Sequence, residues 1–136
     1  ELGIEPLARL RSFAVAAADP TLTYPAVPAA VNKALERAGL TIEDMDLIEI
    51  QEAFAAQVLA DARLMNISES DLDRKVNVNG SGISLGHPIA ATGTLRMVTL
   101  LYEMKRRNAT FGLETICGGG GHGIAAIVER IPSWNK

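Results

Sequence analysis

The sequence contains a single cysteine, Cys117, so no disulfide can form within the chain and a reducing, cytoplasmic location is expected. Aromatic residues make up only 4% of the sequence, which favours the aliphatic packing of α/β proteins. The net charge is −3, and no basic run interleaves with aromatic side chains, which argues against a nucleic-acid partner. No apolar run approaches the roughly 20 residues of a transmembrane helix, so we expect no membrane span.

What is present is enough apolar sequence for one domain. Hydrophobic residues make up 48% of the 136 residues, a length sufficient to bury a core. The chain begins with Glu1 rather than methionine, and residues 1–6 resemble the end of a helix that runs into a loop. We therefore interpret the sequence as a piece of a longer polypeptide.

Periodicity and turn signals predict alternating strands and helices. Strands are expected at residues 7–17, 47–50, 76–78, 110–117 and 123–131. Helices are expected at residues 27–38, 53–65 and 90–107, with a short capped turn at 41–44 and polar loops at 68–75 and 80–88. The order βαβαβαββ predicts an α/β fold with a largely parallel sheet, covered by helices and ending in an antiparallel strand.

Cys117 stands directly before four glycines, Gly118 to Gly121, between the last two predicted strands. Consecutive glycines permit positive φ and let a ligand approach backbone N–H groups, which together can bind an oxyanion. The simpler alternative is a buried cysteine beside a tight hairpin. For His122, next to the glycines, we favour a surface or turn role.

A second unusual site is Gly86-His87-Pro88, at the end of the Gly/Ser-rich loop and before the long helix. The positive end of a helix disfavours an imidazolium, so we expect a neutral His87 that can act as a base. A purely structural histidine remains the alternative.

Gln51-Glu52-Ala53-Phe54 joins a predicted strand to a helix. Gln51 stands at the carboxyl end of the strand, where α/β sheets bind their ligands. Glu52 lies in the first helical turn, where its charge complements the helix dipole, and this is a sufficient structural account.

The segment from Gly82 to Gly86 also matches G-x-S-x-G, the nucleophile elbow of hydrolases, with Ser84 as nucleophile. Pro88 delays the helix that should follow directly, and such short matches are common by chance, so the hydrolase interpretation is disfavoured. The same loop imitates a dinucleotide-binding fingerprint, but Leu85 stands where a glycine is needed.

Three blocks in order, residues 51–57, 76–93 and 117–120, resemble the thiolase family of acetyl-CoA acetyltransferases and 3-ketoacyl-CoA thiolases. The resemblance covers essentially the whole chain as the C-terminal half of a thiolase. It implies a thiolase-like α/β domain over residues 1–136, with a five-stranded mixed sheet and helices on both faces.

The resemblance implies that His87 activates a nucleophilic cysteine and later helps to hold a thioester oxyanion. Cys117 would be the acid/base that removes or returns the α-proton of the second acyl-CoA; a thiol suits this because its pKa, about 8.5, lies near neutrality. The glycines Gly86, Gly118 and Gly119 would line the substrate and the second oxyanion hole. Gln51 departs from the family's usual asparagine, which fixes a water in the active site.

In the family the nucleophilic cysteine and most coenzyme A contacts belong to the N-terminal half. We therefore expect coenzyme A thioesters as substrates, no resident cofactor or metal, an N-terminal thiolase domain as partner, and a homo-oligomeric complete enzyme. The 136 residues alone should be inactive. Two alternatives stay open: a non-enzymatic thiolase-like interaction module, and a decarboxylating ketosynthase, which would normally need a second histidine or asparagine in place of Cys117.

Overall fold

A computed structural model describes residues 3, 6–22 and 25–131 of the chain. The elements in chain order are β1 (Ala8–Ala17), α1 (Ala26–Ala38), η1 (Ile42–Asp44), β2 (Leu47–Ile50), α2 (Ala55–Leu64), α3 (Glu69–Lys75), α4 (Gly82–Leu85), α5 (Thr92–Arg107), β3 (Phe111–Gly118) and β4 (His122–Arg130). None of the described helices is long and apolar enough to cross a membrane.

The sheet has four strands among the described residues, in the order β1-β4-β3-β2, and not the five expected. The predicted strand at 76–78 forms only one parallel bridge, between Ile48 and Val76. The next residue, Asn77, has a φ of 48°, and its side chain bonds both the N–H and the carbonyl of Ile50, at 2.7 and 2.9 Å. The side chain of Asn77 therefore makes the hydrogen bonds to the backbone of β2 that a fifth strand would have made.

The expectation of a largely parallel sheet is also wrong, because only β2 and β3 run parallel in the described part of the chain. The glycine turn makes β3 and β4 an antiparallel hairpin, and β1 joins the far side of β4 antiparallel. The sheet is thus mixed, but it is dominated by antiparallel pairs.

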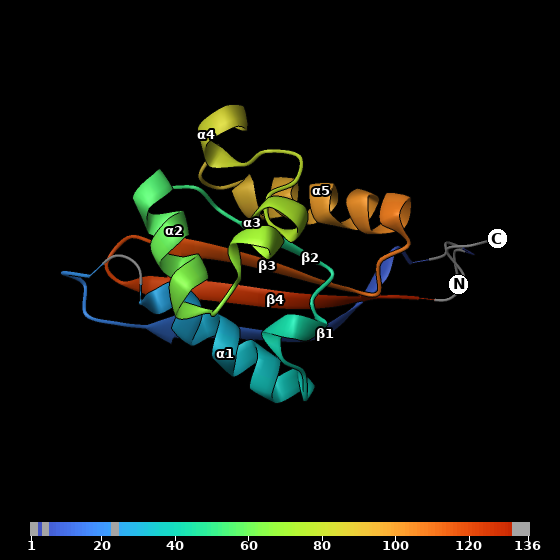
Figure 1. Ribbon diagram of the computed structural model, residues 1–136, viewed down its shortest axis with the longest axis horizontal. Coiled ribbons are helices and arrows are strands. Elements are labelled where there is room, and N and C mark those ends of the chain that lie inside the picture. The colour runs from blue at the N-terminus through green and yellow to red at the C-terminus, as the bar shows by residue number, and fades with distance from the viewer. Residues whose placement is uncertain (1–2, 4–5, 23–24, 132–136) are drawn as a thin grey trace.

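Helices cover both faces, as predicted: α1 lies on one side of the sheet and α5 on the other (Figure 1). Side chains alternate between the two faces. Ile48 and Ile50 point into the larger core under α1, whereas Leu47 belongs to a smaller cluster under α5.

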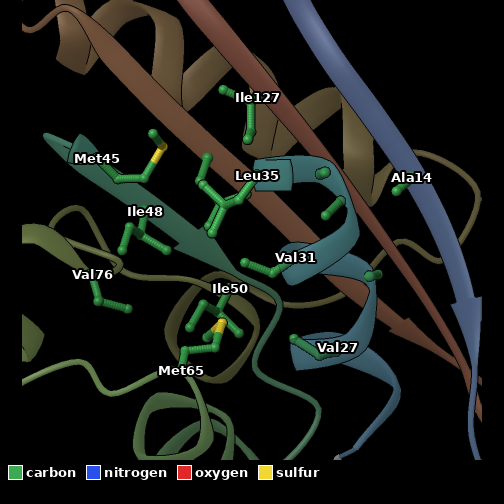
Figure 2. Close-up of a cluster of buried hydrophobic side chains, with 14 of the residues drawn as sticks. Ala14, Val27, Val31, Leu35, Met45, Ile48, Ile50, Met65, Val76 and Ile127 are labelled. Atoms are coloured by element: carbon green, nitrogen blue, oxygen red, sulfur yellow. The ribbon is translucent and has the colours of Figure 1, made fainter. Parts of the chain in front are cut away.

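The larger core is aliphatic apart from methionine, as the low aromatic content predicts (Figure 2). Its buried members come from α1, α2, all four strands and the residues directly after η1, α2 and α3: Ala14, Val27, Ala30, Val31, Ala34, Leu35, Met45, Ile48, Ile50, Val58, Met65, Val76, Leu113, Ala125 and Ile127. This core fixes the positions of β2 and β3, whose carboxyl ends carry the candidate site.

Two loop predictions need correction. Residues 69–75 form the helix α3, because the hydroxyl of Ser68 caps it by accepting from the N–H of Asp71 and because Leu72 packs on the core. The segment 80–88 contains one helical turn, α4, which ends at Gly86 with a φ of 89°. The helices α2 and α5 begin two residues later than predicted.

Candidate active site

Gln51 and Cys117 lie at the same edge of the sheet, because β2 and β3 run parallel and both residues stand at the carboxyl ends. The N–H of Gln51 donates to the carbonyl of Thr115 at 3.0 Å, and Cys117 follows two residues later on β3. The edge predicted from the position of Gln51 is therefore the edge that also carries the thiol.

The side chain of Gln51 is 1% exposed, and neither of its amide atoms has a hydrogen-bond partner among the described residues. It faces the α4 loop: a Cβ placed on Gly82 would lie 2.5 Å from Nε2 of Gln51. Ser81 fixes the loop there, because its hydroxyl donates to the carbonyl of Ile50 at 3.0 Å. A buried amide without a partner costs about 1–3 kcal/mol, so this one suits a bound molecule that supplies the missing hydrogen bonds.

His87 is exposed in the loop between α4 and α5, and its Nδ1 lies 2.7 Å from Oγ1 of Thr92, the first residue of α5. If Nδ1 carries the proton, it donates to Thr92 and leaves a lone pair on Nε2, the form that a base requires. Gly93, which follows Thr92 in α5, lies against Ile116, and Ile116 directly precedes Cys117. The start of α5 thus brings the His87 loop beside the strand of the thiol.

Cys117 is half-buried and pairs with Gly123 across the β3–β4 hairpin. Burial raises the pKa of its thiol, and the nearby carboxylate of Asp61 raises that pKa further. The thiol form therefore dominates near neutral pH, and in this form Cys117 can donate a proton. Gly123 is required for close packing, because a Cβ there would lie 2.2 Å from the carbonyl oxygen of Ala26.

The four positions from Gly118 to Gly121 differ in whether the structure requires glycine there. Gly120 and Gly121 have φ of 77° and 80°, which the tight turn requires. Gly119 has neither a positive φ nor any atom within 4 Å of a Cβ placed on it, so the turn alone does not require glycine at that position. Gly118 pairs with His122, whose exposed ring lies 2.8 Å from the carbonyl of Gly119, in keeping with a turn residue.

Sequence reasoning missed a cluster of buried ionisable side chains beneath this edge. Glu49, Arg96 and Glu114 are 2%, 2% and 7% exposed. Burial raises the pKa of Glu49 to about 8 and that of Glu114 to about 7, while the charge of Arg96 acts in the opposite direction on both. The signal that could have found the two glutamates is that each stands alone as an acidic residue inside a mostly apolar strand.

Asp61 of α2 was missed as well. Its side chain is fully buried, its carboxylate accepts a hydrogen bond from Nε2 of Gln57, and burial raises its pKa to about 7. In the sequence both residues belong to a helix of strong helix formers, and nothing there showed that they face inward.

The hydrolase interpretation finds no support in the geometry. Ser84 is exposed within α4, its hydroxyl donates to the carbonyl of Ser81 at 3.5 Å, and the imidazole of His87 pairs with Thr92 instead. No strand leads directly into α4, as a nucleophile elbow would require. Among the described residues no group of three or more histidine, cysteine or acidic side chains could hold a metal ion.

The fold is an α/β domain in which a buried amide and a thiol stand at the carboxyl ends of two parallel strands, and an imidazole lies in the loop before α5, the helix that packs on these strands. The family model described as "Thiolase, C-terminal domain" matches residues 4–130. The chain belongs to the thiolase family.

Two curated relatives show the extent of this likeness. The chain is 51% identical over 131 residues to an acetyl-CoA acetyltransferase of Syntrophomonas wolfei, and the match covers 96% of this chain and 33% of that protein. It is 50% identical over 135 residues to a 3-ketoacyl-CoA thiolase of a Marinomonas species, with the same coverage. The chain thus spans about a third of the length of these relatives.

Solved structures agree with this assignment. The acetyl-CoA acetyltransferase of Bacillus anthracis superposes with a TM-score of 0.88 at 43% identity, over 95% of this chain and 32% of that one. Human mitochondrial 3-ketoacyl-CoA thiolase gives a TM-score of 0.87 at 38% identity, over 93% of this chain and 31% of that one.

Proposed function

We propose that this chain is the C-terminal catalytic domain of an acyl-CoA acyltransferase that cleaves 3-ketoacyl-CoA by thiolysis or forms it by Claisen condensation. The observation that supports the proposal is that Gln51 and Cys117 stand at the same end of the sheet in a thiolase-family domain, with the His87 loop held by α5, whose Gly93 lies against β3. The names of the relatives supply the class of substrate.

In the proposed first half-reaction His87 takes the proton of a nucleophilic thiol supplied by the rest of the enzyme. The resulting thiolate attacks the thioester carbonyl, the acyl group moves to the nucleophile, and the coenzyme A thiolate leaves and is protonated. His87 is suited to this step because Thr92 fixes one ring nitrogen and leaves the other for the substrate side.

In the second half-reaction Cys117 acts as acid or base. In condensation its thiolate removes the α-proton of a second acyl-CoA, and the carbanion attacks the acyl group on the nucleophile. In thiolysis the thiol of Cys117 returns that proton to the leaving carbanion. The raised pKa of Cys117 favours the protonated form that thiolysis requires.

The partner of this domain is proposed to be an N-terminal thiolase domain. The helix α5 packs mainly on β2 and β3, and the same side of β1 and β4 keeps Phe13, Val15 and Ile124 exposed at 57%, 49% and 45%. The outer side of α5 exposes Leu95 and Val98 at 46% and 48%. So much exposed apolar surface on one side favours a covering layer of protein.

The helical turn α4 and the loop that joins it to α5 also favour a covering domain. Ile83 and Leu85 of α4 and Ile89 of the loop are 63%, 60% and 83% exposed, near His87 in the sequence. A nucleophile delivered by that domain would then stand close to His87. The isolated 136 residues are therefore proposed to be inactive, and a homo-oligomeric complete enzyme stays a prediction.

The test uses a complete chain in which this domain is joined to the remaining two thirds of a thiolase. After incubation with acetyl-CoA, mass spectrometry should find an acetyl adduct on the wild type and on Cys117→Ala, but none, or one formed about 10² to 10⁴ times more slowly, on His87→Ala. Cys117→Ala should nevertheless lose condensation. An adduct on His87→Ala but none on Cys117→Ala would reverse the two roles.

The alternatives predict other results. Ser84→Ala is the matched control, and it should keep full activity because Ser84 is placed outside the site; loss of activity would revive the hydrolase interpretation. A wild type that is never acylated by acyl-CoA would favour the interaction module.

A further inference from the structure

Arg96 is one of the largest fully buried side chains of the domain, at 2% exposure. Its Nη2 donates a hydrogen bond of 3.0 Å to the carbonyl of Gly86, the residue directly before His87. Burying a guanidinium costs free energy unless its charge and its N–H groups find partners. The hydrogen bond from Arg96 to the loop carbonyl is therefore a feature that needs an explanation.

The helix α5 holds this loop at two consecutive residues. Thr92 bonds the ring of His87, and Arg96, four residues later, bonds the carbonyl of Gly86. Residues four apart lie on one face of a helix, so the two contacts come from the same side of α5. Without them the exposed His87 would depend on the glycine-rich loop alone for its orientation.

Two buried carboxyl groups of the sheet lie near Arg96. Glu49 and Glu114 are partners in the β2–β3 register, and both lie within electrostatic reach of Arg96. Neither carboxylate comes within ion-pair distance of Arg96 in the described part of the chain. Nη2 of Arg96 bonds the carbonyl of Gly86, its Nε has no partner among the described residues, and the two carboxyl groups interact with its charge only through space.

We propose that Arg96 is a positioning residue: it anchors the carbonyl of Gly86 so that the imidazole of His87, held at Thr92, keeps one orientation toward the substrate. The proposal rests on the proposed function, in which His87 carries the acyl-transfer step. Misplacement of a reacting group by about 1 Å can cost on the order of 10²-fold in rate, so one lost anchor is enough to matter.

The test compares two variants of the complete chain with the wild type. Arg96→Met removes the anchor, and Glu49→Gln/Arg96→Met removes it together with one of the two buried acids that Arg96 faces, so that fewer buried acids are left without their cation. Both should lower kcat of acyl transfer about tenfold to a hundredfold with KM changed less than about threefold. The ¹⁵N resonances of the His87 ring should shift and broaden.

Arg107→Met is the matched control, because Arg107 lies on the same helix, bonds Glu103 and the carbonyl of Arg74, and is placed outside the site. It should leave both kcat and the His87 resonances as in the wild type. Arg96→Lys keeps the buried charge and decides the matter if the neutral variants unfold, since the shorter lysine should not reach the carbonyl of Gly86 as Nη2 does and should lower kcat in the same direction.

A kcat within twofold of the wild type in the folded variants, or unchanged His87 resonances, would overturn the proposal. A wild type that acyl-CoA does not acylate would refute the proposed function instead, and the His87 resonances would still decide whether Arg96 positions the ring.

Discussion

Glu49 on β2 and Glu114 on β3 are register partners on the face of the sheet under α5, and both side chains are buried. A single guanidinium, that of Arg96, lies close enough to stabilise them, so burial prevails and the pKa of each carboxyl group is raised. Two buried acids on neighbouring strands are a costly feature beside a candidate active site, and they give the domain a characteristic pH dependence.

We expect the domain to lose stability as the pH rises from about 5 to 8. Burial raises the pKa of Glu49 from 4.5 to about 8, against the charge of Arg96, while Glu114, Glu52 and Glu103 raise it further. The folded state thus holds a proton that the unfolded state has released in this window, which lowers the free energy of unfolding by on the order of 1 kcal/mol per pH unit.

Glu49→Gln should flatten this slope and make the protein more stable than the wild type at pH 8, as measured by thermal melting between pH 5 and 8. Glu36→Gln, at an exposed carboxylate of α1, is the control and should keep the wild-type slope. An unchanged slope in Glu49→Gln would mean that this carboxyl group does not carry the proton.

Gly82→Ala should destabilise the domain by about 1–3 kcal/mol, because the added methyl group would overlap two neighbours. Its Cβ would lie 2.5 Å from Nε2 of Gln51 and 2.7 Å from the carbonyl oxygen of Glu52. Denaturant unfolding measures the loss. Gly119→Ala serves as the stability control, since a Cβ there meets nothing within 4 Å, and equal losses in the two variants would contradict the predicted overlap.

Gln51→Asn in the complete enzyme should retain most activity and shift the preference between acetyl and longer acyl groups. The buried amide of Gln51 has no partner among the described residues, and a shorter amide still offers a donor and an acceptor. Gln51→Leu should lose more, on the order of 1 kcal/mol or above in transition-state stabilisation, because the hydrogen bond is lost altogether. Steady-state kinetics on short and long 3-ketoacyl-CoA substrates measures both. Wild-type kinetics for Gln51→Leu would leave the residue without a role in the site.

The isolated 136 residues should self-associate as their concentration rises, because the apolar side around α5 and β1 would lack the covering domain that we propose. Light scattering over a wide concentration range tests this. The double change Leu95→Gln/Val98→Gln should reduce association, whereas Leu64→Gln, an equally exposed leucine on α2, should not. A monomer at all concentrations would count against a missing partner layer.

The sequence by itself determined the family, most of the helices and strands, and the three places where site residues could stand. These features are local: Cys117 before its glycines, His87 in its loop and Gln51 at a strand end are all defined by their immediate neighbours. The same holds for the helix at residues 27–38, whose apolar spacing and terminal glycine predicted it within one residue.

Only the tertiary structure decided the strand order, the loss of the fifth strand at Asn77 and the burial of Glu49, Arg96 and Glu114. Each depends on contacts between segments far apart in the chain, such as Asn77 with Ile50 or helix α5 with strand β2. The sequence pattern around a glutamate in a strand is the same whether its side chain faces water or another glutamate. Its environment is fixed only when helix α5 closes over the sheet.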